Sequence, residues 1–294
     1  MNSASSETGV QLSVIITAQL RTPRNYVFRP SGNRLSQLRR GLKAGDDALM
    51  APSMAFVVRH PAAGAIVIDT GFHPDVRTNL RRDFGVPMSL LFKDIRPAVK
   101  PFDQQLRELD VDPAGVERVL MTHLHVDHTS GMRLLPNATF VCSRAEWAAT
   151  RMRFAARAGY VRHHLPDTAR MDLIDFAGAV PYGPFERSLD LLGDGSIRLL
   201  YTPGHTKGHV SILLRLEGGR QAMLVGDAAY TLRNIRDVTL PLLTADDDAS
   251  LRTLRALNAF AEQNPEAILV PSHDPVAWHA LRSLATVEET ECAA

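Results

Sequence analysis

The most informative part of the sequence is the segment 123–128, HLHVDH, in which four of six side chains can bind a metal ion. Imidazole nitrogens and carboxylate oxygens are the ligands that Zn²⁺ takes in catalytic sites, and Mn²⁺, Fe²⁺ and Co²⁺ accept them too. The chain has only 11 histidines in 294 residues, so three within six positions are improbable by chance. The segment therefore predicts a metal site.

The backbone before this segment predicts how its side chains are oriented. The apolar run 118–121 indicates a buried strand that leads directly into the segment. In an extended backbone alternate side chains share one face. We therefore expect His123, His125 and Asp127 to point in one direction and His128 in another, so that the segment can contact two adjacent metal ions.

Three further candidate ligands stand where other predicted strands end. They are His205 after the strand 197–201, Asp227 after the strand 222–225, and His273 after the strand 267–270. Functional side chains often lie on loops just beyond rigid strands. Together with the first segment they make seven ligands, enough for two metal ions with positions left for water.

The rest of the composition is that of an ordinary globular protein. Hydrophobic residues make up 45% and charged residues 22%, and a net charge of +1 gives no sign of nucleic-acid binding. No apolar run reaches the roughly 18 residues of a membrane span, and the N-terminus does not resemble a signal peptide. The two cysteines, Cys142 and Cys292, cannot form a disulfide framework. We therefore expect a cytoplasmic enzyme with a small-molecule substrate and no nucleic-acid or membrane partner.

The elements that must position the ligands are strands and a few helices, arranged in two comparable halves. Strands are predicted at 10–18, 54–60, 65–69, 118–121, 138–141, 197–201, 210–216, 222–225 and 267–270. Helices are predicted at 35–42, 74–83, 102–109, 143–157 and 250–262, the fourth from the capping-box spacing of Ser143 and Glu146. Layered sheets with helices outside would bury the apolar faces. We expect one domain over residues 1–294, with residues 1–9 disordered and 19–50 largely an extended loop.

The candidate ligands, in their order along the chain, resemble those of the metallo-β-lactamase superfamily. The sequence DTG at 69–71, after a predicted hairpin, is similar to a supporting element of that family. The resemblance covers residues 54–278 and implies an α/β fold, an αββα sandwich with the site at one edge. It implies that His123, His125 and His205 hold one metal ion, that Asp127, His128 and His273 hold a second, and that Asp227 bridges both.

Two features resemble one branch of the superfamily. A carboxylate at position 227 is similar to the dinuclear hydrolases rather than to most true β-lactamases. Tyr230, three residues later, resembles the tyrosine that contacts the lactone carbonyl in N-acyl-homoserine lactonases, the quorum-quenching branch. The resemblance implies ring opening by a metal-bridging hydroxide on two divalent ions, zinc before manganese, iron or cobalt. Tyr230 would stabilise the oxyanion, and Asp127 would carry a proton to the leaving alkoxide.

Other interpretations stay open at this point. A glyoxalase II-like thioesterase, a phosphodiesterase or an organophosphate hydrolase would use the same ligands. A di-iron redox protein of this superfamily usually carries a flavin module, and the chain shows no Gly-rich nucleotide loop. A non-catalytic ligand binder is expected to have lost metal ligands. The segments 1–50 and 159–195 depart from the lactonases, so the acyl-chain preference stays open; a homodimer is expected by resemblance only.

Overall fold

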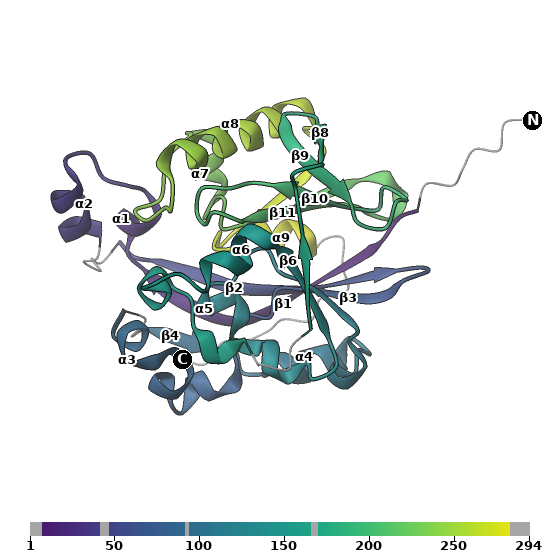
Figure 1. The fold of residues 1–294 in the computed structure, drawn as a ribbon, viewed down its shortest axis with the longest axis horizontal. Coiled ribbons are helices and arrows are strands. Elements are labelled where there is room, and N and C mark those ends of the chain that lie inside the picture. Colours follow the sequence, from purple (N-terminus) through teal and green to yellow (C-terminus); the bar gives the residue numbers. More distant parts are fainter. Residues whose placement is uncertain (1–7, 42–46, 92–93, 166–169, 283–294) are drawn as a thin grey trace, which may run out of the picture.

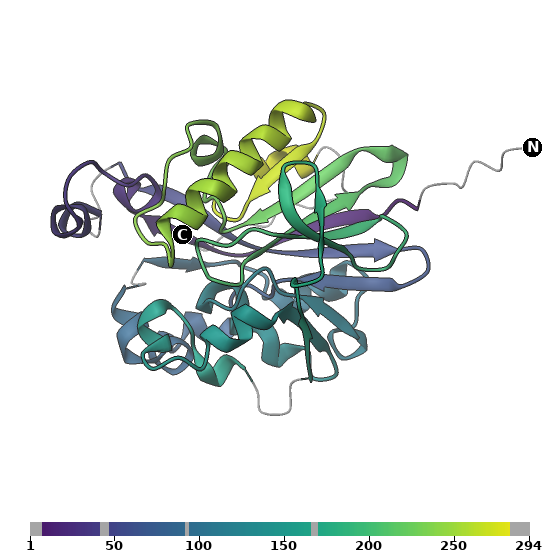
Figure 2. The ribbon, with the colours of Figure 1, turned by 45° about the horizontal axis from the view of Figure 1, so that its top comes forward.

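Two facing β-sheets form the centre of the molecule, and helices cover their outer sides (Figures 1 and 2). The computed structural model describes residues 8–41, 47–91, 94–165 and 170–282. The first sheet has the order β4 (Ile95–Pro97), β1 (Gln11–Thr22), β2 (Leu49–His60), β3 (Gly64–Ile68), β5 (Arg118–Leu120), β6 (Thr139–Ser143) and β7 (Arg170–Ile174). The second has the order β13 (Ile268–Pro271), β12 (Gln221–Gly226), β11 (Val210–Arg215), β10 (Ile197–Tyr201), β9 (Phe185–Asp190) and β8 (Val180–Tyr182).

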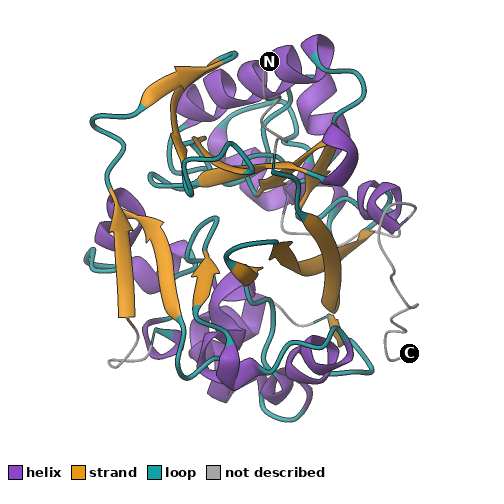
Figure 3. Cartoon of the chain, turned by 90° about the vertical axis from the view of Figure 1, so that its right-hand side faces the viewer, coloured by secondary structure: helices purple, strands orange, loops and turns teal. Residues whose placement is uncertain are grey.

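The helices lie in two outer layers, above and below the strands in Figure 3. On the side of the first sheet lie α3 (Leu80–Leu91), α4 (Phe102–Glu108), α5 (Val126–Thr129) and α6 (Arg144–Ala149). On the side of the second lie α7 (Leu232–Arg236) and α8 (Asp247–Gln263). Along the chain, two short helices, α1 (Arg24–Val27) and α2 (Arg34–Gly41), connect β1 to β2, and α9 (Ala277–Arg282) follows β13. This is the αββα sandwich that the resemblance implied.

Strand β2 shows why the sequence forms these layers. Its side chains alternate between two hydrophobic cores: Met54 and Phe56 face the space between the sheets, and Ala55 and Val57 face the outer layer. Both faces of the strand are therefore buried, which explains its nearly continuous apolar run. In the second sheet the outer faces pack on α7 and α8 through residues such as Leu257.

The segment 19–50 is more ordered than the sequence indicated. Strand β1 continues to Thr22, helices α1 and α2 follow it, and β2 begins at Leu49. The expectation of a largely extended loop was therefore wrong for the described part of this segment. Arg, Pro and Gly weaken local periodicity, so contacts with distant segments decide the structure here. The disorder expected at residues 1–9 falls almost entirely outside the described residues.

Two helices differ from their predicted bounds. The predicted helix 74–83 is a 3₁₀ turn, Pro74–Arg77, followed by α3, which continues to Leu91 across a kink at Gly85. Gly85 adopts φ 71°, which glycine tolerates, so the kink lies at this residue. The predicted helix 143–157 ends at Ala149, and shorter 3₁₀ turns follow it. Among the described residues no helix is long and apolar enough to cross a bilayer.

Candidate metal centre

Seven side chains from both sheets meet at one edge of the sandwich, where strands β5, β10, β12 and β13 end. They form two groups in which the potential ligand atoms lie within 4.8 Å of one another. One group contains His123, His125 and His205, and the other contains Asp127, His128, Asp227 and His273. The structure thus brings together all seven residues that the sequence singled out.

The first group is held close by short distances between its imidazoles. His205 Nε2 lies 2.9 Å from His125 Nδ1. The His123 and His125 rings meet edge to face, with centroids 4.7 Å apart. His123 is fully buried, so the surrounding side chains hold its ring in place.

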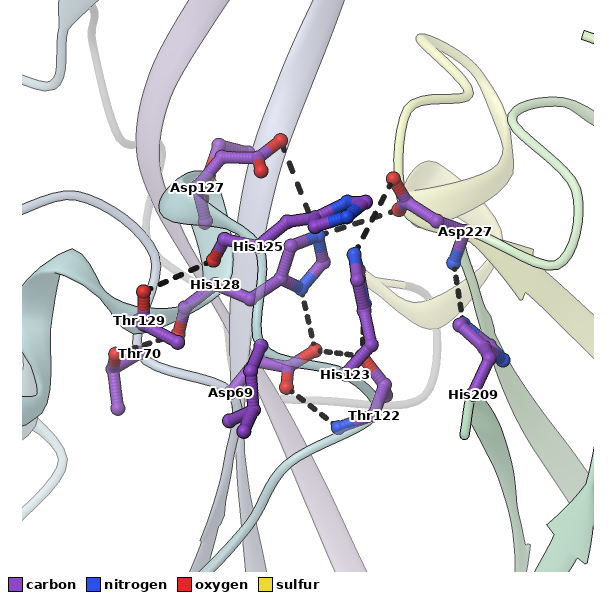
Figure 4. A network of polar contacts seen from close by, with 12 residues as sticks. Asp69, Thr70, Thr122, His123, His125, Asp127, His128, Thr129, His209 and Asp227 are labelled. Atoms are coloured by element: carbon purple, nitrogen blue, oxygen red, sulfur yellow. Dashed lines mark hydrogen bonds and ion pairs between the residues drawn. The ribbon is translucent and has the colours of Figure 1, made fainter. Parts of the chain in front are cut away.

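Asp227 lies between the two groups. Its Oδ2 is 3.4 Å from His205 Nε2 and 3.9 Å from His123 Nε2 in the first group. The same oxygen is 3.3 Å from His273 Nε2, and Oδ1 is 3.3 Å from His128 Nε2 in the second. Figure 4 shows this carboxylate facing both His123 and His128.

Several atoms at the centre of the cluster have no hydrogen-bond partner among the described residues, although they are buried. They are His123 Nε2, His128 Nε2 and Asp227 Oδ1. Buried polar atoms are nearly always paired, because leaving one unpaired costs the desolvation of that group. Divalent cations would satisfy such atoms, and nitrogen and carboxylate oxygen donors suit them. The residues present therefore fit a metal centre.

The protonation of the first group suits cation binding. Burial lowers the pKa of His123 and of His205 well below the usual histidine value, so both rings are neutral and offer lone pairs. Burial would raise the pKa of Asp227, but His273 and His128 outweigh it and hold that pKa well below its usual range. Asp227 is therefore ionised.

In the second group, the neighbouring carboxylates favour the protonated form of the two histidines, His128 and His273. Burial would lower the pKa of His128, but the carboxylates of Asp69, Asp227 and Asp127 outweigh it and hold the pKa well above its usual value. The same opposition, led by Asp227, raises the pKa of His273 to about 9. Binding of a cation would therefore release protons from these two rings.

One expectation about the motif was wrong. The backbone is extended only as far as His125, which caps the helical turn α5. Val126 N donates to Gly159 O and His128 N to His125 O, so the chain turns instead of continuing as a strand. Asp127 therefore joins the group of His128 and does not share a face with His123 and His125.

Asp69 orients His128 from behind. Its carboxylate accepts hydrogen bonds from Thr122 N (2.8 Å), Thr122 Oγ1 (2.7 Å) and His128 Nδ1 (2.8 Å), as Figure 4 shows. The bond to Nδ1 leaves Nε2 facing the cluster, which is the usual support of a metal-binding histidine. Asp69 itself adopts φ 53°, which places its carboxylate under the motif.

His209 supports Asp227 in a comparable way. Its Nε2 accepts a hydrogen bond from Asp227 N (3.0 Å), and Thr202 Oγ1 bonds its Nδ1 at 2.9 Å. The preceding Gly226 has φ 64°, and a Cβ there would lie 2.6 Å from His209 Nε2. The strand end that presents Asp227 therefore requires glycine.

Glu146 is a supporting residue whose role the sequence did not reveal. Its carboxylate is fully buried and accepts hydrogen bonds from Leu124 N (3.0 Å), Gly208 N (3.1 Å) and Tyr160 OH (3.0 Å). It thereby joins the loop after β5 to the loop after β10. The capping-box spacing correctly predicted that Ser143 caps a helix, α6, but it gave no sign that the Glu146 side chain turns inward.

Tyr230 lies beside both groups of ligands. It is 3% exposed, and its ring centroid is 5.2 Å from that of His273 and 5.7 Å from that of His205. Tyr26, which the sequence did not indicate, stacks on it from helix α1 with centroids 5.9 Å apart and planes 9° apart. A pair of phenols therefore borders the cluster.

Comparison with known proteins shows which family, relatives and solved structures the chain is similar to. The profile of the Metallo-beta-lactamase superfamily matches residues 50–273. The N-acyl homoserine lactonase AttM of Agrobacterium fabrum (strain C58) is 34% identical over 232 residues, which are 77% of this chain and 83% of that protein. The crystal structure of a mutant of Bacillus thuringiensis AiiA, with N-decanoyl-L-homoserine bound at its active site, superposes with a TM-score of 0.72 at 20% identity, covering 92% of this chain and 96% of that one.

A second solved structure is similar over the same length. AidC, described as a dizinc quorum-quenching lactonase in complex with a product, superposes with a TM-score of 0.58 at 15% identity, covering 92% of each chain. At such low identity the structural likenesses show the fold alone, whereas the match to AttM extends to the sequence.

Proposed function

Because the chain belongs to the metallo-beta-lactamase superfamily, we propose that it is a metal-dependent hydrolase that opens the ring of N-acyl homoserine lactones. The observation that carries this proposal is the place of Tyr230, next to both ligand groups and three residues beyond Asp227. The 34% identity with a lactonase over most of both chains supports the same substrate class.

In this proposal the two ligand groups hold two divalent cations. His123, His125 and His205 would hold one, Asp127, His128 and His273 the other, and Asp227 would contribute to both. The cations, once bound, would supply Lewis acidity and lower the pKa of a bound water to about 7. Zinc is the metal we propose, because five imidazoles and two carboxylates suit it and the AidC neighbour is described as dizinc.

The chain's own residues would handle the substrate's oxygen atoms and one proton. The Tyr230 hydroxyl would donate to the carbonyl oxygen as negative charge develops there. Water adds to the carbonyl carbon, and the ring carbon–oxygen bond breaks. Asp127, whose carboxylate lies 3.5 Å from His273 Nε2 at the edge of the cluster, would take the proton of the water and give it to the leaving alkoxide.

The test is proton release on addition of N-acyl homoserine lactones of short and long chain to metal-loaded protein. Ring opening converts a neutral lactone into a carboxylate, so each turnover releases one proton at neutral pH. We expect acid production that a chelator abolishes, with a chain-length profile that describes the pocket. No acid from protein shown to carry two metal ions would reject this substrate class and favour thioesters or phosphoesters.

A further inference from the structure

The segment that follows helix α6 has an excess of positive charge. Residues 147–165 contain four arginines and two histidines but no aspartate or glutamate, although the net charge of the whole chain is only +1. Arg151, Arg153 and Arg157 are exposed, and none of the three is paired with a carboxylate of another described residue. The positive charge of this segment is therefore not balanced locally.

Apolar side chains are exposed beside these arginines. Met152 is 56% exposed and Phe154 is 62% exposed. Val86, which is 60% exposed, lies on helix α3, and α3 packs against the 3₁₀ turn Ala155–Ala158. Apolar side chains that gather on a surface commonly mark a binding site. We refer to the following residues as the basic-apolar surface: Val86, Arg151, Met152, Arg153, Phe154 and Arg157.

The backbone of Phe154 is strained at the point where its ring is exposed. Its φ of 102° and ψ of 21° are a left-handed conformation, which is unfavourable for a bulky side chain and suits glycine. Such strain is found at functional sites, where the surrounding structure maintains it. The guanidinium groups of Arg153 and Arg157 lie 5.1 and 4.9 Å from the ring centroid, so the exposed ring contacts two positive charges.

The basic-apolar surface is close to the candidate metal centre along the chain. Gly159 O accepts a hydrogen bond from Val126 N (3.0 Å) within the metal-binding motif. A Cβ at Gly159 would lie 3.1 Å from His125 Cδ2, and the Tyr160 ring contacts the His125 ring with centroids 4.9 Å apart. A partner that binds this surface is therefore held only a few residues from a candidate metal ligand.

We propose that the basic-apolar surface docks on a bilayer containing anionic phospholipids, with its arginines on the lipid phosphates and with Met152 and Phe154 among the headgroups. Guanidinium groups bind phosphate oxygens through paired hydrogen bonds, and apolar side chains gain free energy by leaving water. A nucleic acid offers the same phosphates but no apolar layer for Met152 and Val86. The expectation that the protein has no membrane partner rested on the lack of a spanning segment and of a signal peptide, and surface docking needs neither.

The experiment is cosedimentation of the full metal-loaded chain with lipid vesicles. We expect binding to vesicles of phosphatidylcholine and phosphatidylglycerol in equal parts, and roughly 100-fold weaker binding to phosphatidylcholine alone. Salt should weaken the binding, since the Debye length falls to about 10 Å at 0.1 M. Each arginine near an anionic surface is worth roughly fivefold in binding, so the triple variant with Arg151→Gln, Arg153→Gln and Arg157→Gln should bind about 100-fold more weakly than the wild type.

A control variant separates the local charge from the total charge. It replaces three other exposed arginines with glutamine, which changes the net charge by the same amount: Arg220, Arg252 and Arg255. We expect this variant to bind the anionic vesicles like the wild type. A loss as large as that of the first triple variant would mean that only the total charge matters, and it would overturn the proposal.

Phe154→Gly tests the strained residue with two measurements. Loss of the ring should weaken binding to anionic vesicles about tenfold. The thermal midpoint should be no lower than that of the wild type, because glycine adopts φ 102° without steric cost. Val180→Thr, at a similarly exposed position on the edge strand β8, should leave vesicle binding unchanged. Unchanged binding or a lower midpoint in Phe154→Gly would assign the ring to the fold and overturn its part in docking.

Two further outcomes would overturn the proposal. One is equal binding of the wild type to both kinds of vesicle, or binding to neither. The other is tighter binding to a single-stranded oligonucleotide than to anionic vesicles, which would assign the surface to nucleic acid. None of these measurements uses a lactone, so a failure of the proposed lactonase function would leave their outcome unaffected.

Discussion

The histidines of the candidate centre differ in protonation because their neighbouring side chains differ. His123 is buried among other imidazoles, which together with burial keep it neutral. His128 is equally buried, but it faces three carboxylates and holds a proton in the absence of metal. The neutral His123 can donate a lone pair to a cation. The protonated His128 compensates the negative charge of the nearby carboxylates when no cation is bound.

At the residue scale, Tyr230→Phe tests the role of the hydroxyl beside the ligands. A single donor to a developing oxyanion is typically worth about 10²-fold or more in rate, so we expect kcat on the lactone to fall by roughly 10². Metal content, measured by elemental analysis, should not change, because the ring fills the same space. An unaltered rate would remove Tyr230 from its proposed role.

Glu146→Gln tests whether this carboxylate positions the ligands. The amide can accept only part of what the carboxylate accepts from Leu124 N, Gly208 N and Tyr160 OH, so the two loops that carry His123, His125 and His205 should loosen. We expect metal affinity to fall about 10-fold, measured by competition with a chelator of known affinity. Glu262→Gln, an exposed change on α8, is the control. Equal affinities in both variants would show that Glu146 serves stability alone.

At the scale of elements, the strands that lead to the candidate ligands were more predictable than the helix bounds or the long strands β1 and β2, which extend four and five residues beyond their predicted bounds. Strands such as β10 and β11 were located to within a residue or two, because a buried strand carries its pattern in its own residues. The seven candidate ligands could be found for the same reason, since each stands in or next to such a pattern. Glu146 and Tyr26 could not, because their roles depend on which distant loops fold against them.

Helix α3 offers a test at this scale through the fully buried Asp83. Its carboxylate accepts hydrogen bonds from Ser130 Oγ (2.5 Å) and from the Arg133 guanidinium (2.7 Å), which ties α3 to the segment just after the metal-binding motif. Burial would raise the pKa of Asp83, but hydrogen bonds from His164 and Ser130 and the charge of Arg133 lower it below its usual value.

Asp83→Asn should therefore lower the free energy of unfolding at pH 7 by about 1.5–3 kcal/mol, the value of hydrogen bonds to a charged group. A lowered pKa in the folded state means that this stabilisation is complete above about pH 3.9 and is lost as the pH falls through the lower, folded value. The difference from wild type should thus be constant between pH 7 and 5 and shrink below about pH 4. Urea denaturation of the metal-free proteins measures it, with the exposed Asp248→Asn as control; a difference that shrinks already at pH 6 would contradict the assignment.

At the scale of the whole molecule, the candidate ligands come from both sheets. The motif of residues 123–128 follows β5 in the first sheet, whereas His205, Asp227 and His273 follow strands of the second. Cations bound there would link the two layers at their common edge. A ligand that binds only the folded state stabilises it by mass action.

Removal of the metal should therefore lower thermal stability. Free metal at about 1,000 times its dissociation constant contributes about 4 kcal/mol, which corresponds to roughly 6–7 °C in a chain of 294 residues. We expect chelated protein to unfold at a correspondingly lower temperature in calorimetry and to recover when zinc is restored. An identical midpoint for protein shown to have lost its metal would mean that the ions do not link the layers.

Helices α1 and α2, which lie between β1 and β2 along the chain, can change in sequence without changing the candidate ligands. This stretch supplies Tyr26 and none of the seven candidate ligands. Substitutions within it therefore leave every candidate ligand in place. A directed-evolution library aimed at new esters can therefore vary residues 23–41 without removing a candidate ligand.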